Sequence, residues 1–224
     1  MAIVVVKVGG SLAMYPQSLR TLCKKIAVIA KRQKLVIVPG GGEFTDTVRA
    51  VDKRFSLSSV ASHRMAILGM DQYGLMLTDL TPEFAATADL DEAQKVLDAG
   101  KVPVFLPSKH LFSRDPLENS WDVTSDSIAL YVASELHADK LLLVTDVDGV
   151  FTADPRKYKW ATLLQKVSPV ELSELEQRTS VDKALPKLLL QWQIDCYVVN
   201  GLFPERVEAI FDGQDSVYTV ISGK

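Results

Sequence analysis

The sequence predicts an α/β fold, a three-layer αβα sandwich in which helices cover both faces of a central, mainly parallel sheet. Short apolar runs alternate with longer helical patterns along the chain, which is the order that βαβ units produce. Most of these runs are rich in Val, Ile and Leu with little polar alternation, as is typical of strands covered on both faces. A chain of 224 residues is long enough for such a domain to bury a sizeable core.

Apolar runs mark the expected strands, and the spacing between them marks the expected helices. We expect strands at residues 3–8, 35–38, 102–106, 141–145, 196–199 and 216–221. A helix is expected over 17–31, because apolar residues recur three or four positions apart from Leu19 to Ile29. The same spacing predicts a helix over 124–137, and a helix over 91–99 is expected to end at the glycine that follows it.

The stretch 107–121 has no periodicity and concentrates Pro, Ser, Asp and Asn, so we expect a loop there, close to a functional site. We treat 1–224 as a single domain with a soft boundary near Ala138, because a fresh βα series begins after it. The boundary divides the domain into an N-terminal lobe, about 1–138, and a C-terminal lobe, about 139–224.

Composition excludes several classes of protein. The chain has 25 Lys and Arg against 28 Asp and Glu, whereas a dedicated nucleic-acid binder carries a basic excess. Every apolar run is far shorter than the roughly 18 residues that cross a bilayer, and the N-terminus lacks the layout of a signal peptide. Cys23 and Cys196 lie in apolar patterns, and the three histidines are too scattered for a zinc site. We therefore expect a cytoplasmic protein with a small-molecule partner, no nucleic acid, no membrane and no metal site of its own.

Two glycine clusters that follow apolar strands are the strongest local signals of a binding site. One stands in VKVGGS, residues 6–11, and the other in VPGGGEF, residues 38–44. Glycines let backbone N–H groups approach a ligand closely, and a helix that begins beyond them adds unpaired donors and partial positive charge. The clusters therefore predict an anion site with Lys7 beside it. The phosphate-binding candidates are Gly9, Gly10, Ser11, Gly40, Gly41 and Gly42.

Other interpretations of the glycine clusters stay open at this point. Either cluster alone also fits a tight strand-to-helix turn with no ligand. Neither completes the GxxxxGK[ST] or GxGxxG pattern, so the two common nucleotide-binding folds that carry those patterns are disfavoured.

Hydroxyl and carboxyl groups follow the strand expected at 141–145. The segment LLLVTDVDGVFTADP delivers Thr145, Asp146 and Asp148 to a turn at Gly149, and side chains at the carboxyl end of a parallel strand are well placed to hold a ligand. The segment alone also resembles the DxDG start of haloacid-dehalogenase-type phosphatases, with Asp146 as the nucleophile. That alternative leaves the glycine clusters unexplained, and too little chain follows to supply the rest of that fold.

Charged residues near two expected helix starts complete the set of candidates. Asp126, in WDVTSDSIALYVA, lies in the first turn of a helix, where a carboxylate also satisfies helix donors without any further role. In TSVDKALPKLLL, Pro186 is typical of a helix start, so Lys183 precedes the helix and Lys187 lies in its first turn. Lysines are unfavourable at a helix N-terminus, and two of them indicate an anion that offsets the cost.

Taken in order, these motifs resemble those of the amino acid kinase family. They are a KxGGS loop, a PGGG loop after the second strand, a T-S-D-S helix start, a TDVDGV segment followed by DP, and a late lysine before a helix. The resemblance covers almost the whole chain. It implies an αβα sandwich that binds a phosphoryl acceptor in the N-terminal lobe and ATP, with Mg2+, in the C-terminal lobe. It also implies a homo-oligomer, since family members associate through helices of the N-terminal lobe.

The resemblance implies a role for each candidate residue. Lys7 is expected to bridge the acceptor and the transferred phosphoryl group, and Asp126 to orient the lysines. Lys183 or Lys187 is expected to stabilise the leaving side, with Lys183 favoured. The nucleotide-binding candidates are Thr145, Asp146, Gly149, Phe151, Asp154 and Pro155. The acceptor-binding candidates are Glu43, Phe44, Arg49, His63 and Arg64, of which the two arginines also fit solvated helix charges and the histidine an ordinary structural residue.

Within the family, the segments VPGGGEFTDTVR, SHRMAILGMDQYG and YVVNGLFPERV most resemble a small archaeal and methylotroph branch. Its members convert a phosphomonoester, [5-(aminomethyl)furan-3-yl]methyl phosphate, into a diphosphate in methanofuran biosynthesis. Isopentenyl phosphate kinases carry a histidine soon after the second glycine cluster, where this chain has Thr45 and Asp46. The alternatives are a kinase of another small phosphate or carboxylate, and a non-catalytic nucleotide- or oxyanion-binding protein of the same fold.

Overall fold

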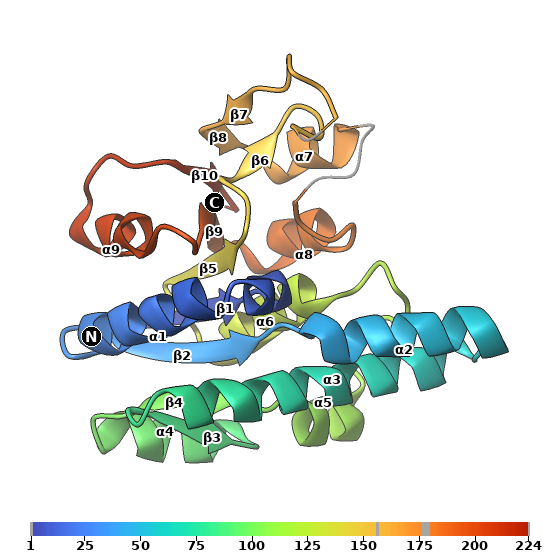
Figure 1. The fold of residues 1–224 in the computed structure, drawn as a ribbon, viewed down its shortest axis with the longest axis horizontal. Coiled ribbons are helices and arrows are strands. Elements are labelled where there is room, and N and C mark those ends of the chain that lie inside the picture. Colours follow the sequence, from blue (N-terminus) through green and yellow to red (C-terminus); the bar gives the residue numbers. More distant parts are fainter. Residues whose placement is uncertain (1, 156, 176–179, 224) are drawn as a thin grey trace.

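The computed structural model describes residues 2–155, 157–175 and 180–223, and it confirms the α/β fold class (Figure 1). The eight-stranded main sheet has the order β3-β4-β2-β1-β5-β9-β10-β8. Its strands are β1 (Ile3–Val8), β2 (Lys34–Pro39), β3 (Phe84–Thr87), β4 (Val102–Phe105), β5 (Lys140–Thr145), β8 (Lys166–Val167), β9 (Asp195–Asn200) and β10 (Tyr218–Ile221). Neighbouring strands are parallel except for β9 and β10. A separate antiparallel ribbon contains β6 (Val150–Phe151) and β7 (Leu163–Leu164).

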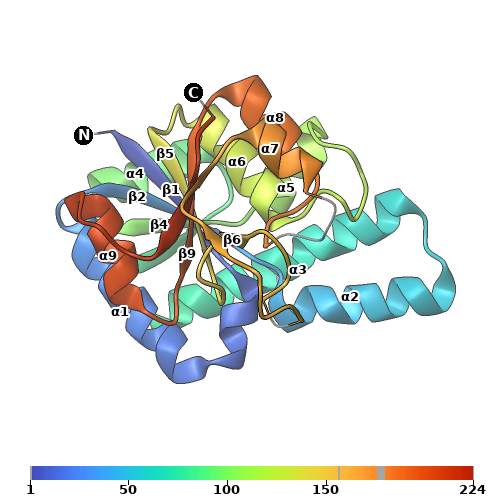
Figure 2. The same ribbon diagram turned by 90° about the horizontal axis from the view of Figure 1, so that it is seen from above.

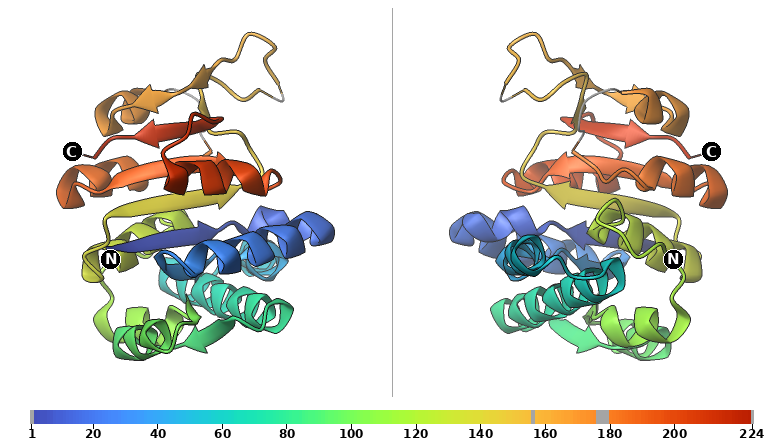
Figure 3. Two further views of the ribbon diagram at one scale, coloured as in Figure 1. Left: turned by 90° about the vertical axis from the view of Figure 1, so that its left-hand side faces the viewer. Right: turned by 90° about the vertical axis from the view of Figure 1, so that its right-hand side faces the viewer.

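Helices cover both faces of the main sheet, as Figures 1 and 3 show. They are η1 (Gly10–Met14, a 3-10 helix), α1 (Pro16–Ala30), α2 (Gly42–Phe55), α3 (Ser59–Leu80), α4 (Leu90–Asp98), α5 (Ser108–Arg114), α6 (Ser125–Glu135), α7 (Pro169–Glu174), α8 (Leu185–Trp192) and α9 (Pro204–Asp212). One face packs against α6 and α8, and the other against α1 and α9. The α2–α3 pair extends past the sheet, as Figure 2 shows from above.

Alternation along β1 determines which of its side chains meet which helices. Val4, Val6 and Val8 belong to the core cluster on the side of α1 and α9, whereas Val5 belongs to the cluster on the side of α6 and α8. Successive side chains of a strand point to opposite faces, so Lys7 shares its face with Val5. The strand pattern alone therefore directs this lysine toward α6.

The expected strands are all present, each within two residues of its expected ends, and so are the three expected helices. The sequence pattern missed β3, β6, β7 and β8. Of these, β3 and β8 lie at the two edges of the main sheet, and none of the four exceeds four residues. Short and partly exposed strands carry too few apolar residues to stand out as buried runs.

The expectation of an unbroken loop over 107–121 was wrong, because α5 occupies Ser108–Arg114. This helix buries His110 and Leu111 against the core. Seven residues make only two turns, which is too short for a periodic pattern to be read from the sequence.

The main sheet continues across the boundary expected near Ala138, because β1 pairs with β2 on one side and with β5 on the other. The division into two lobes stays a prediction. Within the described residues, no helix combines the length and apolar character needed to cross a membrane.

Candidate active site

The two glycine loops meet at the carboxyl ends of β1 and β2. In the register of these strands Val8 lies opposite Pro39, so both loops begin at the same level of the sheet. A Cβ atom on Gly10 would lie 2.0 Å from the backbone nitrogen of Gly42, and one on Gly40 would lie 2.4 Å from the nitrogen of Gly10. No side chain fits between backbones at these distances, so the contact between the loops requires glycine.

The second glycine loop leads into a helix start whose backbone donors are uncapped. Gly41 precedes the first residue of α2, and no described side chain caps this helix start. Uncapped N–H groups and the helix dipole together favour an anion. The other loop is held from behind, since Tyr73 of α3 donates a hydrogen bond to the carbonyl of Gly9 at 3.1 Å and the Gly9 N–H donates to the carbonyl of Val144 at 2.7 Å.

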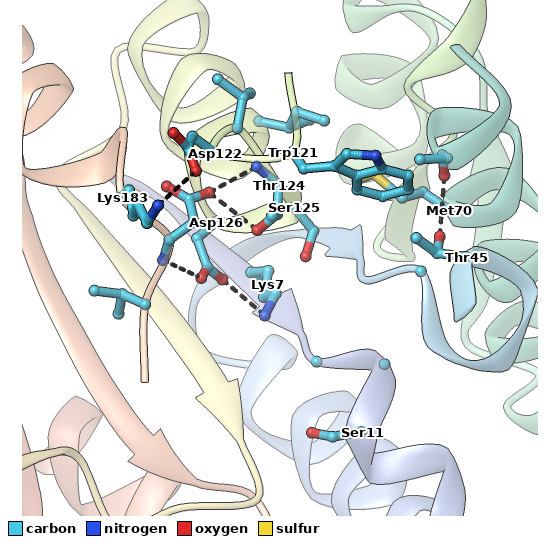
Figure 4. Close-up of a pocket in the computed structure, with 18 of the residues that line it drawn as sticks. Lys7, Ser11, Thr45, Met70, Trp121, Asp122, Thr124, Ser125, Asp126 and Lys183 are labelled. Carbon is cyan, nitrogen blue, oxygen red and sulfur yellow. Dashed lines mark hydrogen bonds and ion pairs between the residues drawn. The ribbon is translucent and has the colours of Figure 1, made fainter. Parts of the chain in front are cut away.

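A cavity of ≈ 910 Å³ opens at these loops (Figure 4). It brings together many of the candidates that the sequence suggested, from segments far apart along the chain. Those that line it are Lys7, Gly9, Gly10, Ser11, Gly41, Gly42, Glu43, Arg49, His63, Asp126 and Lys183. Gly40 lies behind the lining, where its N–H donates to the carbonyl of Val8 at 2.8 Å.

Lys7 and Asp126 form a buried ion pair within this cavity. Lys7 Nζ lies 2.8 Å from Asp126 Oδ1, and both side chains are at most 10% exposed. The lysine reaches α6 because of its face on β1, and the aspartate reaches the lysine because it lies in the first turn of α6. A cation at the end of a central strand is thus fixed beside the donors of the glycine loops.

Asp182 is a functional candidate that sequence reasoning missed. Its carboxylate accepts five hydrogen bonds, from the backbone and hydroxyl of Thr124, the backbone and hydroxyl of Ser127, and the backbone of Leu185. It therefore caps the starts of both α6 and α8. Its own N–H donates to Asp126 Oδ2 at 3.1 Å. Burial, and then the nearby charge of Asp126, raise the pKa of the Asp182 carboxyl.

The structure separates the two candidate lysines near α8. Lys183 lines the cavity, and its Nζ lies 3.2 Å from Asp122 Oδ1 (Figure 4). Lys187 is exposed and is not among the residues that line the cavity. Pro186 lies in the first turn of α8, so the helix begins where its sequence predicts. The first residue of the motif, Thr179, lies outside the described residues.

The acceptor candidates also divide into residues that line the cavity and residues that do not. Glu43, Arg49 and His63 line the cavity, whereas Phe44 and Arg64 do not. The Arg64 guanidinium lies 5.4 Å from the ring centre of Phe112 on α5, away from the cavity. Burial lowers the pKa of His63, although a hydrogen bond to the backbone of Ser120 opposes this effect.

The predicted nucleotide segment follows β5 but does not line this cavity. Thr145 ends β5, and the Ser11 hydroxyl donates to Asp146 at 2.9 Å, so the segment adjoins the first glycine loop. Gly149 has a φ of +150°, and a Cβ there would lie 2.4 Å from the Thr219 hydroxyl. The remaining candidates, Phe151, Asp154 and Pro155, lie in β6 and in the turn that follows it.

Trp121, which sequence reasoning also missed, lines the cavity and contacts two residues of α2. Trp121 donates its Nε1–H to Asp52 Oδ2 at 2.7 Å, and the guanidinium of Arg49 lies 4.3 Å from the indole centre. Trp121 follows Ser120 directly in the SWDVTSDSIA segment, and nothing local to that segment indicates its partners on α2.

Comparison with known proteins places this geometry in a family. A model of the amino acid kinase family matches residues 2–200. A [5-(aminomethyl)furan-3-yl]methyl phosphate kinase from Methanocaldococcus jannaschii is 37% identical over 219 residues, which cover 98% of this chain and 97% of that protein. A uridylate kinase from Methanosarcina barkeri is 25% identical over 98% of this chain and 96% of that protein. The solved structure of uridylate kinase from Archaeoglobus fulgidus has a TM-score of 0.76 at 23% identity, covering 99% of this chain and 100% of that chain.

The family match and the full-length relative agree with the motif order and with the sheet. Kinases of this family use ATP and transfer its phosphoryl group to a small molecule. The chain therefore belongs to the amino acid kinase family, and it is a small-molecule kinase.

Proposed function

We propose that the protein transfers the γ-phosphoryl group of ATP to [5-(aminomethyl)furan-3-yl]methyl phosphate, giving a diphosphate for methanofuran biosynthesis. The observation that carries the proposal is the buried Lys7–Asp126 pair, at 2.8 Å, in the cavity where two glycine loops meet. The identity of the acceptor comes from the relative in Methanocaldococcus jannaschii, which is 37% identical over nearly the whole chain.

Phosphoryl transfer passes through a loose transition state, so such a kinase acts mainly by aligning the two substrates and neutralising charge. In the proposed mechanism Lys7 contacts both the acceptor oxygen and the transferred group, and N–H groups of the glycine loops bind the phosphate oxygens. A phosphomonoester is largely ionised at pH 7, because its second pKa is about 6. The acceptor oxygen therefore needs no general base.

The proposed mechanism gives Asp126 and Lys183 supporting roles. Asp126 holds the Nζ of Lys7 in place, and Asp182 fixes the start of α6 that carries Asp126. Lys183 contacts the leaving side of the donor, which its exposed position at the cavity supports. Mg2+ supplies further charge neutralisation when bound with ATP, and Asp146, beside Ser11, is the carboxylate suited to hold it through water.

The acceptor side of the cavity suits a ring that carries an ammonium group. Ala66, Ile67 and Met70 provide an apolar wall from α3, while Glu43 and Asp46 bring carboxylates from the first turns of α2. An ammonium group is attracted by those charges, whereas a carboxylate acceptor is repelled by them. At the end of the acceptor that faces Glu43 and Asp46, this charge pattern favours an ammonium group, as in the aminomethylfuran phosphate, over a second acidic group, as in N-acetylglutamate.

We further propose that residues up to about 138 bind the acceptor, that later residues bind the nucleotide, and that the protein forms a homo-oligomer. Exposed apolar side chains on the α2–α3 pair support the last point, since Phe55 is 65% and Leu75 53% exposed. Size-exclusion chromatography with light scattering tests it, and a monomer at micromolar concentration would contradict it.

An ATP-consumption screen over small acceptors tests the proposed function. The acceptors are the aminomethylfuran phosphate, UMP, isopentenyl phosphate and N-acetylglutamate, and a Lys7→Ala preparation controls for contaminating kinases. We expect the highest kcat/KM for the aminomethylfuran phosphate, with a diphosphate product. Preference for any other acceptor contradicts the proposed substrate, and nucleotide binding without turnover of any acceptor supports the non-catalytic alternative.

A further inference from the structure

Trp121 has no part in the mechanism above, yet it lines the cavity on the acceptor side. Among the described residues, no other Phe, Tyr or Trp lines the cavity. It lies in the segment between α5 and α6, shortly before Asp126. Figure 4 shows its indole directed away from Asp126 and toward the side of the cavity where Thr45 and Met70 lie. An aromatic ring thus borders the space that the acceptor must enter.

Two side chains of α2 hold the indole in place. Asp52 accepts the indole N–H at 2.7 Å, and Arg49 lies over the ring at 4.3 Å. Because the ring is tied at its N–H and packed under a guanidinium, its plane is set before any ligand arrives.

Arg49 covers the indole on one side, and apolar side chains line the same cavity as the indole. Ile67 and Met70 line the cavity from α3, and Val123 and Ile128 line it from the segment before α6 and from α6 itself. A hydrocarbon or ring is the part of an acceptor that suits such walls. Between flat partners, an offset or edge-to-face arrangement of two aromatic rings adds attraction beyond the buried area.

We propose that Trp121 is a specificity-determining residue, which packs against an aromatic five-membered ring of the acceptor and selects ring-bearing phosphomonoesters over aliphatic ones. This inference rests on the proposed function, because the furan of that acceptor is the ring in question. Asp52 and Arg49 are positioning residues that act through the indole. The phosphate of the acceptor then extends toward Lys7, and no bond changes at Trp121 itself.

Steady-state kinetics of Trp121→Leu and Trp121→Phe test the proposal, with Trp160→Leu as the matched control. Trp160 is 63% exposed, lies after β6 and does not line the cavity. KM and kcat are measured for the aminomethylfuran phosphate, isopentenyl phosphate and ATP, after a thermal melt confirms that each variant folds. Trp121→Leu should raise the KM for the furan phosphate by roughly 10-fold and leave the KM for ATP unchanged.

The substitution Trp121→Phe tests whether the acceptor needs an aromatic ring at this position, because phenylalanine keeps a ring that can stack. Trp121→Phe keeps a ring but loses the bond to Asp52, so it should recover most of the acceptor affinity, and Trp160→Leu should match the wild type. An unchanged KM for the furan phosphate in Trp121→Leu overturns the proposal, as does an equal rise for all three substrates. If Trp121→Leu fails to fold, Trp121→Met takes its place as the variant without a ring, and a wild-type ratio of kcat/KM between the two acceptors in Trp121→Met overturns the proposal.

Failure of the proposed function has a different signature. If the wild type phosphorylates UMP instead of the furan phosphate, the proposed substrate is wrong. The inference is then judged by the KM for UMP, whose pyrimidine is also flat, and Trp121→Leu must raise it. If the wild type prefers isopentenyl phosphate, which has no ring, both are overturned.

Discussion

The cavity holds two lysine–aspartate pairs that differ in their exposure to water. Lys7 and Asp126 are 2.8 Å apart, and their side chains are 10% and 9% exposed. Lys183 and Asp122 are 3.2 Å apart, and their side chains are 78% and 59% exposed. The first pair joins the central strand β1 to α6, whereas the second joins two segments that precede helices.

Because the first pair is buried, it is a fixed part of the site. The second pair is exposed to water, so Lys183 is free to change partners. A solvent-exposed pair contributes about 0–1 kcal/mol, so Lys183 loses little when it exchanges Asp122 for an anion. Removing one member of a buried pair costs roughly 3–5 kcal/mol, because the other charge is left unpaired. In the proposed mechanism the first pair supplies a cation that is placed in advance, and the second pair supplies a cation that can follow the substrate.

Breaking the buried pair should have the largest effect. Lys7→Ala is expected to lower kcat by about 100-fold, close to 3 kcal/mol, as removal of one donor to a charged transition state does. It should also lower the free energy of unfolding, since Asp126 stays buried without its cation. Lys25→Ala is the control, because Lys25 pairs with Glu208 at 2.7 Å on the far side of the sheet with both side chains partly exposed. Unchanged turnover of ATP in Lys7→Ala would contradict the role given to this pair.

Asp182 is hydrogen-bonded to Asp126 of the buried pair, although the next residue in the chain is the exposed Lys183. Asp182→Asn should lower the free energy of unfolding by about 2 kcal/mol, because one amide oxygen cannot accept the five hydrogen bonds that the carboxylate accepts. Urea denaturation measures the change. Asp89→Asn is the matched control, since Asp89 caps α4 by accepting one bond from the Glu92 N–H, and asparagine caps a helix equally well. The exposed pair that Asp89 forms with Lys109 contributes little to stability. Equal effects of the two substitutions would show that the Asp182 network adds nothing.

Removing the exposed cation should affect turnover but not stability. Lys183→Ala is expected to lower kcat roughly 10-fold by loss of one charge-assisted contact to the donor, with the melting temperature unchanged. Lys187→Ala, four positions further along, should leave both quantities as in the wild type, because that side chain does not reach the cavity. If Lys187→Ala lowers kcat and Lys183→Ala does not, the assignment of the two lysines is reversed.

The smallest expected effect concerns the buried histidine on the acceptor side. Burial lowers the pKa of His63 below its ordinary value of 6.5. At a pH between the lowered pKa and 6.5, the unfolded chain therefore binds a proton that the folded protein does not. The free energy of unfolding should therefore fall as the pH drops below 6.5, by at most about 1.4 kcal/mol per pH unit from this residue. Urea titrations from pH 7 to pH 5 should show a shallower fall for His63→Gln. His137→Asn, at an exposed left-handed position, should keep the wild-type slope.

Local patterns in the sequence were enough for the six expected strands, for the glycine loops and for the positions of Lys7 and Asp126. They missed β3 and α5, because an edge strand of four residues and a helix of seven are too short to show a period. They also missed Asp182 and Trp121, whose meaning depends on distant partners. The Asp182 carboxylate bonds to Ser127, 55 positions away, and Trp121 bonds to Asp52, 69 positions away.

The sequence by itself determined the family, the alternation of strands and helices, and the two glycine loops, because turn chemistry and periodicity act between near neighbours in the chain. Only the tertiary structure decided that Lys183 reaches the cavity and Lys187 does not, and that the guanidinium of Arg49 lies over the indole of Trp121. Those outcomes depend on sheet register and on helix packing, which bring together side chains that no local spacing relates.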